Sequence, residues 1–384
     1  MKAFREIGRL FIILGFLISA QRCQGQEKDL AAYLLAKGGI TKGICALPRC
    51  GNGEFAVAVA RASGLLVHAQ DPRPEAVAAA QRLADEQGLL GTRVIVERGG
   101  ASPLPYADNV IDLVMVTDPV ALRPGEGVSA AEILRVLRPR GKALLGGKIP
   151  LESELRRWLT EQGIKDAVVT KDAHGVWVEI SKPAPQGVDA WGHWMHGPDN
   201  NPVSQDTVIK APYLTQWLGR PYYTAMPVVT TAAAGRIFVA MGHIAHHDRE
   251  VPTLNTIYAR NGYNGAVLWQ RKLPEGYLVH RSAFIATDDT FFMIDKDSAL
   301  LLDPETGAEK GRIRIPDAQG EWKWMALVGR TLFVLAGESD PVEPTTIVRS
   351  QRDHWSWGEL SKGYYQKPRI PWGFATTKIG RAHV

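Results

Sequence analysis

Two kinds of apolar pattern alternate between residues 29 and 185 of the chain. Short runs rich in Val, Ile and Leu are typical of buried strands, and the longer segments between them carry apolar residues at helical spacing. The predicted strands are Gly43–Leu47, Leu65–Gln70, Thr92–Glu97, Ile111–Val116, Lys142–Gly146, Ala167–Thr170 and Val176–Ile180. The predicted helices are Glu54–Ser63, Pro74–Gly88, Ala130–Leu137 and Glu152–Gln162. This alternation predicts an α/β domain with a doubly wound parallel sheet and helices on both faces.

A Pro- and Gly-rich segment, Ser181–Gly187, separates this domain from a region of different composition. Beyond it, short β-rich runs replace the alternating pattern. Tryptophans recur there at Trp191, Trp194, Trp217 and Trp269. Three strands of similar sequence recur as well, at Arg236–Val239, Thr290–Met293 and Thr331–Val334. We therefore expect a second, all-β domain over residues 191–378.

A turn of similar sequence occurs twice in this second region. The segments ARNGYNGAVLW (Ala259–Trp269) and LDPETGAE (Leu302–Glu309) place the turn glycines Gly265 and Gly307 42 residues apart. A β-rich repeat of about 40–45 residues suits a four-stranded propeller blade. The glycine supplies a positive φ, and the tryptophan ring packs between neighbouring blades. The region has room for about four blades, so we predict an incomplete all-β propeller.

The loop after the first predicted strand reads Leu47-Pro48-Arg49-Cys50-Gly51-Asn52-Gly53. In a parallel sheet, ligands bind at the carboxyl ends of the strands near the topological switch point. Three further stretches follow in order: VHAQDPRPEAV, LPYAD with IDLVMV, and EILRVLRPRG. Together the four pieces resemble the class I S-adenosylmethionine (SAM)-dependent methyltransferases of the methyltransferase type 11 kind, which implies a Rossmann-like fold.

The resemblance also implies a cofactor site at the carboxyl edge of the sheet. In that family the glycine-rich loop approaches SAM, and an acidic residue after the second strand holds the ribose hydroxyls. The residues that match these positions are Cys50, Gly51, Asn52, Gly53 and Asp71. They are the candidate cofactor-binding residues, with SAM as the cofactor.

Three departures from the family pattern weaken this site. Leu47 stands where the family has an acidic residue, Arg49 replaces the first glycine, and Gly100 replaces the usual adenine-contacting aspartate. An arginine at the first glycine position hinders the approach of the loop to a ligand and adds a cation beside a sulfonium group. No residue stands out as a catalytic acid, base or nucleophile. We interpret the domain as degenerate, and an active methyltransferase remains the alternative.

The repeats of the second region resemble those of quinoprotein propellers, which use pyrroloquinoline quinone (PQQ). Gly311 or a neighbour stands where the second repeat would have its tryptophan. No cysteine follows Cys50, so neither a vicinal disulfide nor a C-x-x-C-H haem site is present there. PQQ is therefore not expected, because a shared fold does not carry function. A quinone- or metal-dependent oxidoreductase is a further alternative.

Histidines gather in the inserted segment Gly242–Asp248, with His193 and His196 upstream. Imidazole and carboxylate side chains suit zinc, but no full ligand set has a clear spacing. We interpret the segment as a polar surface loop and assign no metal site.

The N-terminus has the pattern of a secretory signal peptide over residues 1–25. Lys2, Arg5 and Arg9 precede the apolar run Leu10–Ala20, which is shorter than the roughly 20 residues that span a bilayer. We expect a periplasmic or extracellular protein with no membrane span beyond this segment. An uncleaved anchor, a lipoprotein at Cys23 and a cytosolic chain with a misassigned start are the alternatives.

Composition changes the picture in two places. The net charge of +5 is small and spread along 384 residues, so no nucleic-acid partner is expected. The last residues, 379–384, read IGRAHV and resemble a translated sequencing adapter, so we expect the natural chain to continue past about Lys378. A disulfide between Cys45 and Cys50 is possible, because an exported protein can form one.

The sequence as a whole predicts an exported, non-catalytic binding or scaffold protein. Its parts would be a methyltransferase-like domain at 29–185 and PQQ-like propeller repeats at 191–378. The partner would be an unidentified protein or polymer at the propeller surface.

Overall fold

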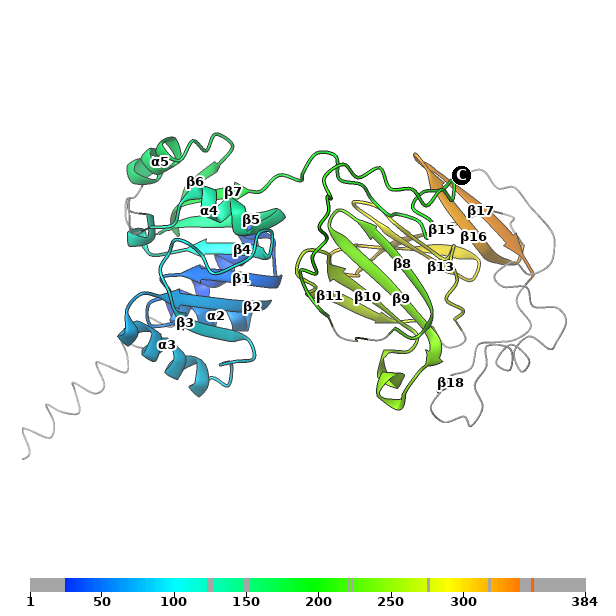
Figure 1. Ribbon diagram of the computed structural model, residues 1–384, viewed down its shortest axis with the longest axis horizontal. Helices are drawn as coiled ribbons and strands as arrows, with labels where there is room; N and C mark the ends of the chain where they lie inside the picture. Colours follow the sequence, from blue (N-terminus) through cyan, green and yellow to red (C-terminus); the bar gives the residue numbers. More distant parts are fainter. Residues whose placement is uncertain are drawn as a thin grey trace, which may run out of the picture. The chain divides into compact units, whose positions relative to one another are not determined.

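The computed structural model describes residues 25–122, 127–147, 152–219, 222, 224–274, 277–316, 319–338 and 347–348. The predicted signal peptide (apart from residue 25) and the segment 379–384 lie outside the described residues. The chain divides into two compact units, Met1–Ala184 and Pro185–Val384 (Figure 1). The division falls within the Pro- and Gly-rich segment.

The first unit is built on one seven-stranded sheet of order β3-β2-β1-β4-β5-β7-β6. Its strands are β1 (Lys42–Pro48), β2 (Gly64–Asp71), β3 (Val94–Arg98), β4 (Ile111–Val116), β5 (Leu137–Gly147), β6 (Val168–Asp172) and β7 (Gly175–Ser181). Each predicted strand is present, with ends that differ by a few residues. The largest difference is β5, which begins five residues earlier than predicted.

Helices cover both faces of this sheet. They are a helix over residues 25–38, α2 (Glu54–Ala62), α3 (Pro74–Glu86), the short 3₁₀ helix η1 (Pro119–Leu122), α4 (Ala130–Val136) and α5 (Glu152–Glu161). The first helix was not predicted. One buried cluster joins residues 30–35, α2 and α3 to the sheet, and a second joins α4 and α5. Neighbouring β1 residues alternate between them: Cys45 and Leu47 belong to the first cluster and Ala46 to the second, as the two-residue period of a strand requires.

The prediction of an all-parallel sheet is wrong at one edge. Strands β1 to β5 run parallel, but β7 pairs antiparallel with both β5 and β6. Only two residues separate β6 from β7. A connection that short forms a hairpin, because a parallel pair needs a crossover of about a dozen residues. The first unit therefore has a mixed, Rossmann-like seven-stranded sheet.

The second unit contains several small antiparallel sheets. The first sheet holds β8 (Met226–Ala233), β9 (Arg236–Ala245), β10 (Thr256–Asn261) and β11 (Val267–Lys272), with β18 (Ile347–Val348) parallel to β9. The 3₁₀ helix η2 (Asp248–Thr253) lies between β9 and β10. The second sheet holds β12 (Phe284–Ala286), β13 (Phe291–Asp295), β14 (Ser298–Leu302) and β15 (Glu309–Arg314). The third holds β16 (Glu321–Val328) and β17 (Thr331–Gly337).

The three recurring sequences of this unit are the second strands of their sheets: β9, β13 and β17 (Figure 1). Consecutive strands pair antiparallel within each sheet. The described residues hold two four-stranded meanders and one pair of strands, and they show no propeller. The finer prediction of a propeller is therefore not established by the fold.

Aromatic rings tie the first two sheets into one core. The ring of Phe238 on β9 stacks on that of Phe291 on β13, with centroids 4.6 Å apart. The ring of Trp269 on β11 lies 6.0 Å from Phe238 and 6.1 Å from Phe291. Trp322 and Met325 of β16 belong to the same buried cluster. The sheets therefore share one hydrophobic core.

Candidate functional site

The sheet order of the first unit defines one switch point. Strands β1 and β4 are neighbours at its centre, while the chain runs from β1 outward through β2 and β3 before it returns to β4. Ligands of such sheets bind in the crevice outside the carboxyl ends of the strands at this point. The loop after β1, the end of β2 and the residues after β4 therefore form the candidate site.

The loop after β1 keeps a backbone path that suits glycine at three alternating positions. Arg49, Gly51 and Gly53 have φ of 61°, 59° and 85°. A Cβ on Gly53 would lie 2.6 Å from Cβ and 2.8 Å from Cα of Ala80 on α3, so only glycine fits there. The same left-handed conformation costs the arginine about 1–2 kcal/mol. Arg49 thus follows the same left-handed backbone path as the two glycines.

Asp71 at the end of β2 is fully buried, and its carboxylate is fully used within the protein. Oδ1 accepts from the backbone nitrogen and Nε of Arg73, at 3.1 and 2.9 Å. Oδ2 accepts from Nη2 of Arg73 and the backbone nitrogen of Gly51, both at 3.0 Å. A carboxylate offers about four acceptor positions, so these four donors fill it.

These donors decide the protonation of Asp71. Burial alone raises the pKa of a carboxyl group. Here the hydrogen bonds from Arg73 and Gly51 and the positive charge of Arg73 outweigh burial and hold the pKa of Asp71 below its usual value. The carboxylate is ionised at neutral pH and is neutralised by Arg73.

A second ion pair joins the residues that follow β1 and β4, at the switch point itself. Nε of Arg49, after β1, lies 3.0 Å from Oδ2 of Asp118, after β4. The side chains are 14% and 28% exposed, so the pair is largely shielded from water. Oδ1 of Asp118 accepts from the backbone nitrogen of Val120, which fixes the carboxylate. The arginine therefore links the two strands between which a ligand would enter.

The remaining predicted site residues have local structural contacts. The backbone nitrogen of Cys50 donates to the carbonyl of Gln70 over 2.7 Å, joining the loop to β2. Oδ1 of Asn52 accepts from the backbone nitrogen of Glu54 at the start of α2. Leu47, at the family's acidic position, is buried in the core and offers no polar group. The structure thus brings the predicted residues together without testing that they bind a cofactor.

The two described cysteines are free thiols. Burial, with a smaller effect of the Asp71 carboxylate, raises the pKa of the Cys50 thiol to about 12. Cys45 is buried in β1 and its pKa is raised even further by burial. Neither is a thiolate at neutral pH, so neither is an activated nucleophile.

Arg73 and Asp118 were not among the predicted site residues. Both positions carried a signal, since each follows closely on the carboxyl end of a predicted strand. The pairing of Asp118 with Arg49 could not be predicted, because the two residues follow strands that are far apart in the sequence.

Four histidines considered as metal ligands in the second unit have other structural roles. His196 Nε2 lies 2.8 Å from Asp189, and His193 Nε2 accepts from the backbone nitrogen of Leu327. His243 is buried in β9, and His247 caps η2 together with Glu250. Within the described residues, no group of three His, Cys, Asp or Glu side chains is arranged to hold a metal ion.

The repeated turn of the second unit has the same hydrogen bonds in both copies. Backbone nitrogens of Gly265 and Gly307 donate to the carbonyls of Asn261 and Asp303, at 2.9 and 2.8 Å. A tryptophan lies against each glycine. The indole nitrogen of Trp217 donates to Gly262, and that of Trp269 to Pro304, three residues before the glycine in each case.

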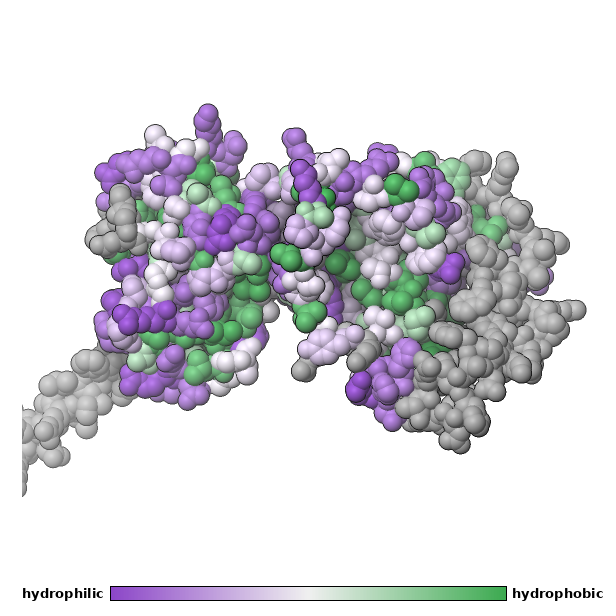
Figure 2. Space-filling model, in the orientation of Figure 1, coloured by the Kyte–Doolittle hydropathy of each residue, from purple (hydrophilic) through white to green (hydrophobic). Residues whose placement is uncertain are grey.

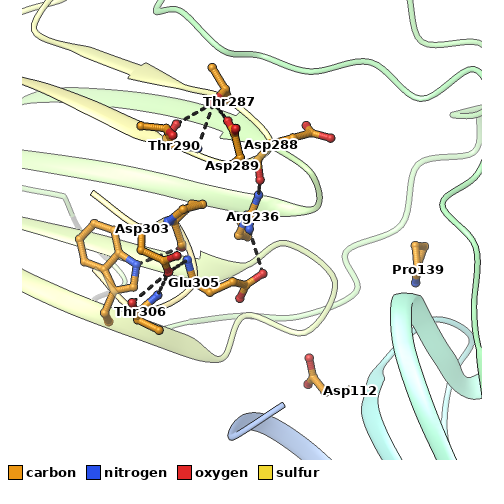
Figure 3. A network of polar contacts seen from close by, with 12 residues as sticks. Asp112, Pro139, Arg236, Thr287, Asp288, Asp289, Thr290, Asp303, Glu305 and Thr306 are labelled. Atoms are coloured by element: carbon orange, nitrogen blue, oxygen red, sulfur yellow. Dashed lines mark hydrogen bonds and ion pairs between the residues drawn. The ribbon is translucent and has the colours of Figure 1, made fainter. Parts of the chain in front are cut away.

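An arginine connects the first sheet to the second beside this turn. Arg236 of β9 lies between the Asp288 carbonyl and the Glu305 carboxylate and contacts both (Figure 3). Oδ1 of Asp303 accepts from the backbone nitrogens of Glu305 and Thr306 and holds the turn. These contacts show that the repeated residues stabilise the turns and the packing of the sheets.

Two surface properties bear on partners. Hydrophilic side chains are spread over the visible face of the first unit instead of gathering in one patch (Figure 2). None of the helices in the described part of the chain has the length and apolar character that crossing a bilayer requires.

Comparison with known proteins finds similarity to methyltransferases in the first unit. Residues 49–141 match the family described as "Methyltransferase domain". Among curated proteins, a demethylmenaquinone methyltransferase of Lactiplantibacillus plantarum is 29% identical over 117 residues, 30% of this chain and 47% of that protein. An uncharacterized protein of Mycobacterium tuberculosis is 32% identical over 113 residues, 29% of this chain and 40% of that protein. The chain thus spans less than half the length of these relatives.

Solved structures show the same kind of likeness. A SAM-dependent methyltransferase of Aquifex aeolicus has 17% identity and a TM-score of 0.33, covering 39% of this chain and 87% of that one. A SAM-dependent O-methyltransferase of Thermotoga maritima has 15% identity and a TM-score of 0.34, covering 41% and 65%. Residues 49–141 are thus similar to a methyltransferase domain, as the family match indicates.

Proposed function

We propose that the protein is exported and acts as a non-catalytic binding or scaffold protein whose methyltransferase domain no longer uses SAM. The observation that carries this proposal is the carboxylate of Asp71, whose four acceptor positions are filled by Arg73 and Gly51. A ribose diol needs the same oxygen atoms. The residues present therefore do not fit SAM as they stand, although the family makes SAM plausible.

The ion pair across the switch point supports the same conclusion. The sulfonium of SAM is a cation, and the Arg49 guanidinium places a second cation in the crevice. Like charges in a shielded site repel, and Asp118 is already neutralised by Arg49. No described side chain at the site has the features of a catalytic acid, base or nucleophile.

The second unit would supply the binding surface. Its two meanders repeat the same tryptophan-on-glycine contact, which supports successive blades of a PQQ-like propeller. We infer that the partner, a protein or polymer outside the cytoplasm, binds there. PQQ itself is not part of the proposal, because the repeat serves packing.

An active SAM-dependent methyltransferase is the second candidate. The match of residues 49–141 and the preserved positive φ at Arg49, Gly51 and Gly53 favour it. Such an enzyme would need Arg73 to leave Asp71 before its cofactor enters.

Titration of SAM into the full-length chain distinguishes the two candidates. We expect no heat of binding at millimolar SAM, whereas a working site would bind at micromolar strength, about −8 kcal/mol. The related curated methyltransferase from Lactiplantibacillus plantarum serves as the positive control. Micromolar binding to this chain would favour the active enzyme.

Fractionation of expressing cells tests export independently. We expect the mature chain outside the cytoplasm, with an N-terminus near residue 25 by sequencing of the purified protein. A chain recovered intact from the cytosol would contradict export.

A further inference from the structure

Arg49 and Arg73 both follow the carboxyl ends of neighbouring strands, β1 and β2, and each forms an ion pair there. Arg73 holds both oxygens of Asp71, beside the loop after β1. Arg49 joins β1 to Asp118 after β4. Three other features of the edge suit a nucleoside ligand: the left-handed path of the loop, the ionised Asp71 and the backbone nitrogen of Gly51 that donates to it.

We propose that the two arginines block the position of a nucleoside at this edge, so that removing both side chains allows binding of a ligand with a vicinal diol. This inference rests on the proposed loss of SAM use and names two residues that cause it. Two ion pairs occupy this edge, Arg73 with Asp71 and Arg49 with Asp118, while the loop after β1 keeps its left-handed path.

Removing the Arg49 side chain and removing the Arg73 side chain have different structural consequences. Arg49 has the φ of a glycine, so Arg49→Gly keeps the loop path and removes the bridge to Asp118. Arg73 is half exposed, and its side chain can leave Asp71 without opening the core. The freed Asp71 would then accept from the two hydroxyls of a ribose, as it now accepts from Nε and Nη2.

The experiment uses the full-length chain as wild type, Arg49→Gly, Arg73→Ala and the double variant. Arg61→Ala is the matched control, because Arg61 lies in the last turn of α2, where it is bonded to Gln87. Adenosine, S-adenosylhomocysteine and 2′-deoxyadenosine are titrated calorimetrically, and thermal unfolding shows which variants are folded. If Arg73→Ala fails to fold, Arg73→Gln replaces it.

We expect no binding by wild type and Arg61→Ala, and at least about 100-fold tighter binding of S-adenosylhomocysteine by the double variant. Adenosine should bind the double variant about 10- to 100-fold more tightly than 2′-deoxyadenosine, because one hydrogen bond to Asp71 is lost.

A folded double variant that binds none of the three ligands would overturn this inference and leave the proposed function standing. Wild type that binds as tightly as the double variant, or more tightly, would overturn both, since the arginines would then be neutral or would contact the ligand themselves.

Discussion

At the scale of single residues, the ability of the site to bind a ligand depends on which donors already contact the carboxylate of Asp71. Asp71 stands at the position where the sequence resemblance predicts a cofactor-binding carboxylate. Arg73, two residues later, fills three of its acceptor positions. The carboxylate is present, but its acceptor positions are used within the protein. Resemblance at one position therefore does not establish a function when the neighbouring side chain can supply the ligand's hydrogen bonds.

The pH dependence of stability tests this arrangement. The pKa of Asp71 is lowered in the folded state, mainly because hydrogen bonds from Arg73 outweigh burial. A lowered folded pKa contributes stability above the ordinary pKa of an aspartate, and this contribution disappears as the pH falls through the folded pKa. We expect the stability advantage of wild type over Asp71→Asn to shrink between about pH 5 and pH 2.

Urea unfolding of both proteins at several pH values measures this difference. Asp118→Asn is a useful comparison, because Asp118 is partly exposed and belongs to the other ion pair. A difference between wild type and Asp71→Asn that is constant with pH would show that Asp71 is not ionised and paired in the folded protein.

At the scale of elements, the loop between β1 and α2 shows how packing fixes a backbone path. Gly53 begins α2 with a left-handed conformation and lies against Ala80 of α3. Gly51 has a similar φ, but nothing lies within 4 Å of a Cβ there. One glycine is thus required by a neighbouring helix and the other by its backbone angle alone.

The two glycines predict different costs. Gly53→Ala should destabilise the first unit by about 2–4 kcal/mol, because strain at positive φ adds to the overlap with Ala80. Gly51→Ala should cost about 1 kcal/mol, from the backbone angle only. Chemical denaturation of both variants measures the difference. Equal losses would mean that α3 does not press against the start of α2.

The same reasoning applies to the tryptophan contact in the second unit. Trp269 is 6% exposed and lies on the turn glycine Gly307, while its strand neighbour Val267 is 41% exposed. Trp269→Ala should cost about 3–5 kcal/mol, since it leaves a cavity against Phe238 and Phe291. Val267→Ala on the same strand should cost less than about 1 kcal/mol. Similar losses for both would exclude this contact as the link between the sheets.

At the scale of the whole molecule, the chain contains two units with separate cores. Buried clusters of the first unit join its helices to one sheet, and those of the second join residues of the small sheets. Separate cores predict separate cooperative transitions. Function therefore need not be shared, and the two parts of the proposal, a shut nucleoside site and a binding surface, belong to different units.

Calorimetric unfolding of the full-length chain should show two transitions. We expect Gly53→Ala to lower only one midpoint and Trp269→Ala only the other, because each residue packs within a single unit. The midpoint of each affected unit should fall by several degrees, since a domain of this size loses about 2–4 °C per 1 kcal/mol. A single transition moved by both variants would show that the units unfold together.

The sequence by itself determined the elements of the first unit and their layering. A strand such as Ile111–Val116, which is apolar except for one aspartate, predicts burial on both faces of the sheet. The helical patterns between such strands predict a layered α/β sheet. These patterns depend only on neighbouring residues in the sequence, so they can be read without knowing which elements pack together. The glycine-rich loop and Asp71 could be placed at one edge for the same reason.

Only the tertiary structure decided what that edge can do. The hairpin β6–β7 took an antiparallel place in the sheet because its turn is too short for a crossover. Arg49 lies beside Asp118 because β1 and β4 are neighbours in the sheet, although 62 residues of chain lie between the end of β1 and the start of β4. Hydrogen bonds between side chains of distant strands depend on the packed geometry. This is why the loop could be recognised from the sequence while the ion pair between Arg49 and Asp118 could not.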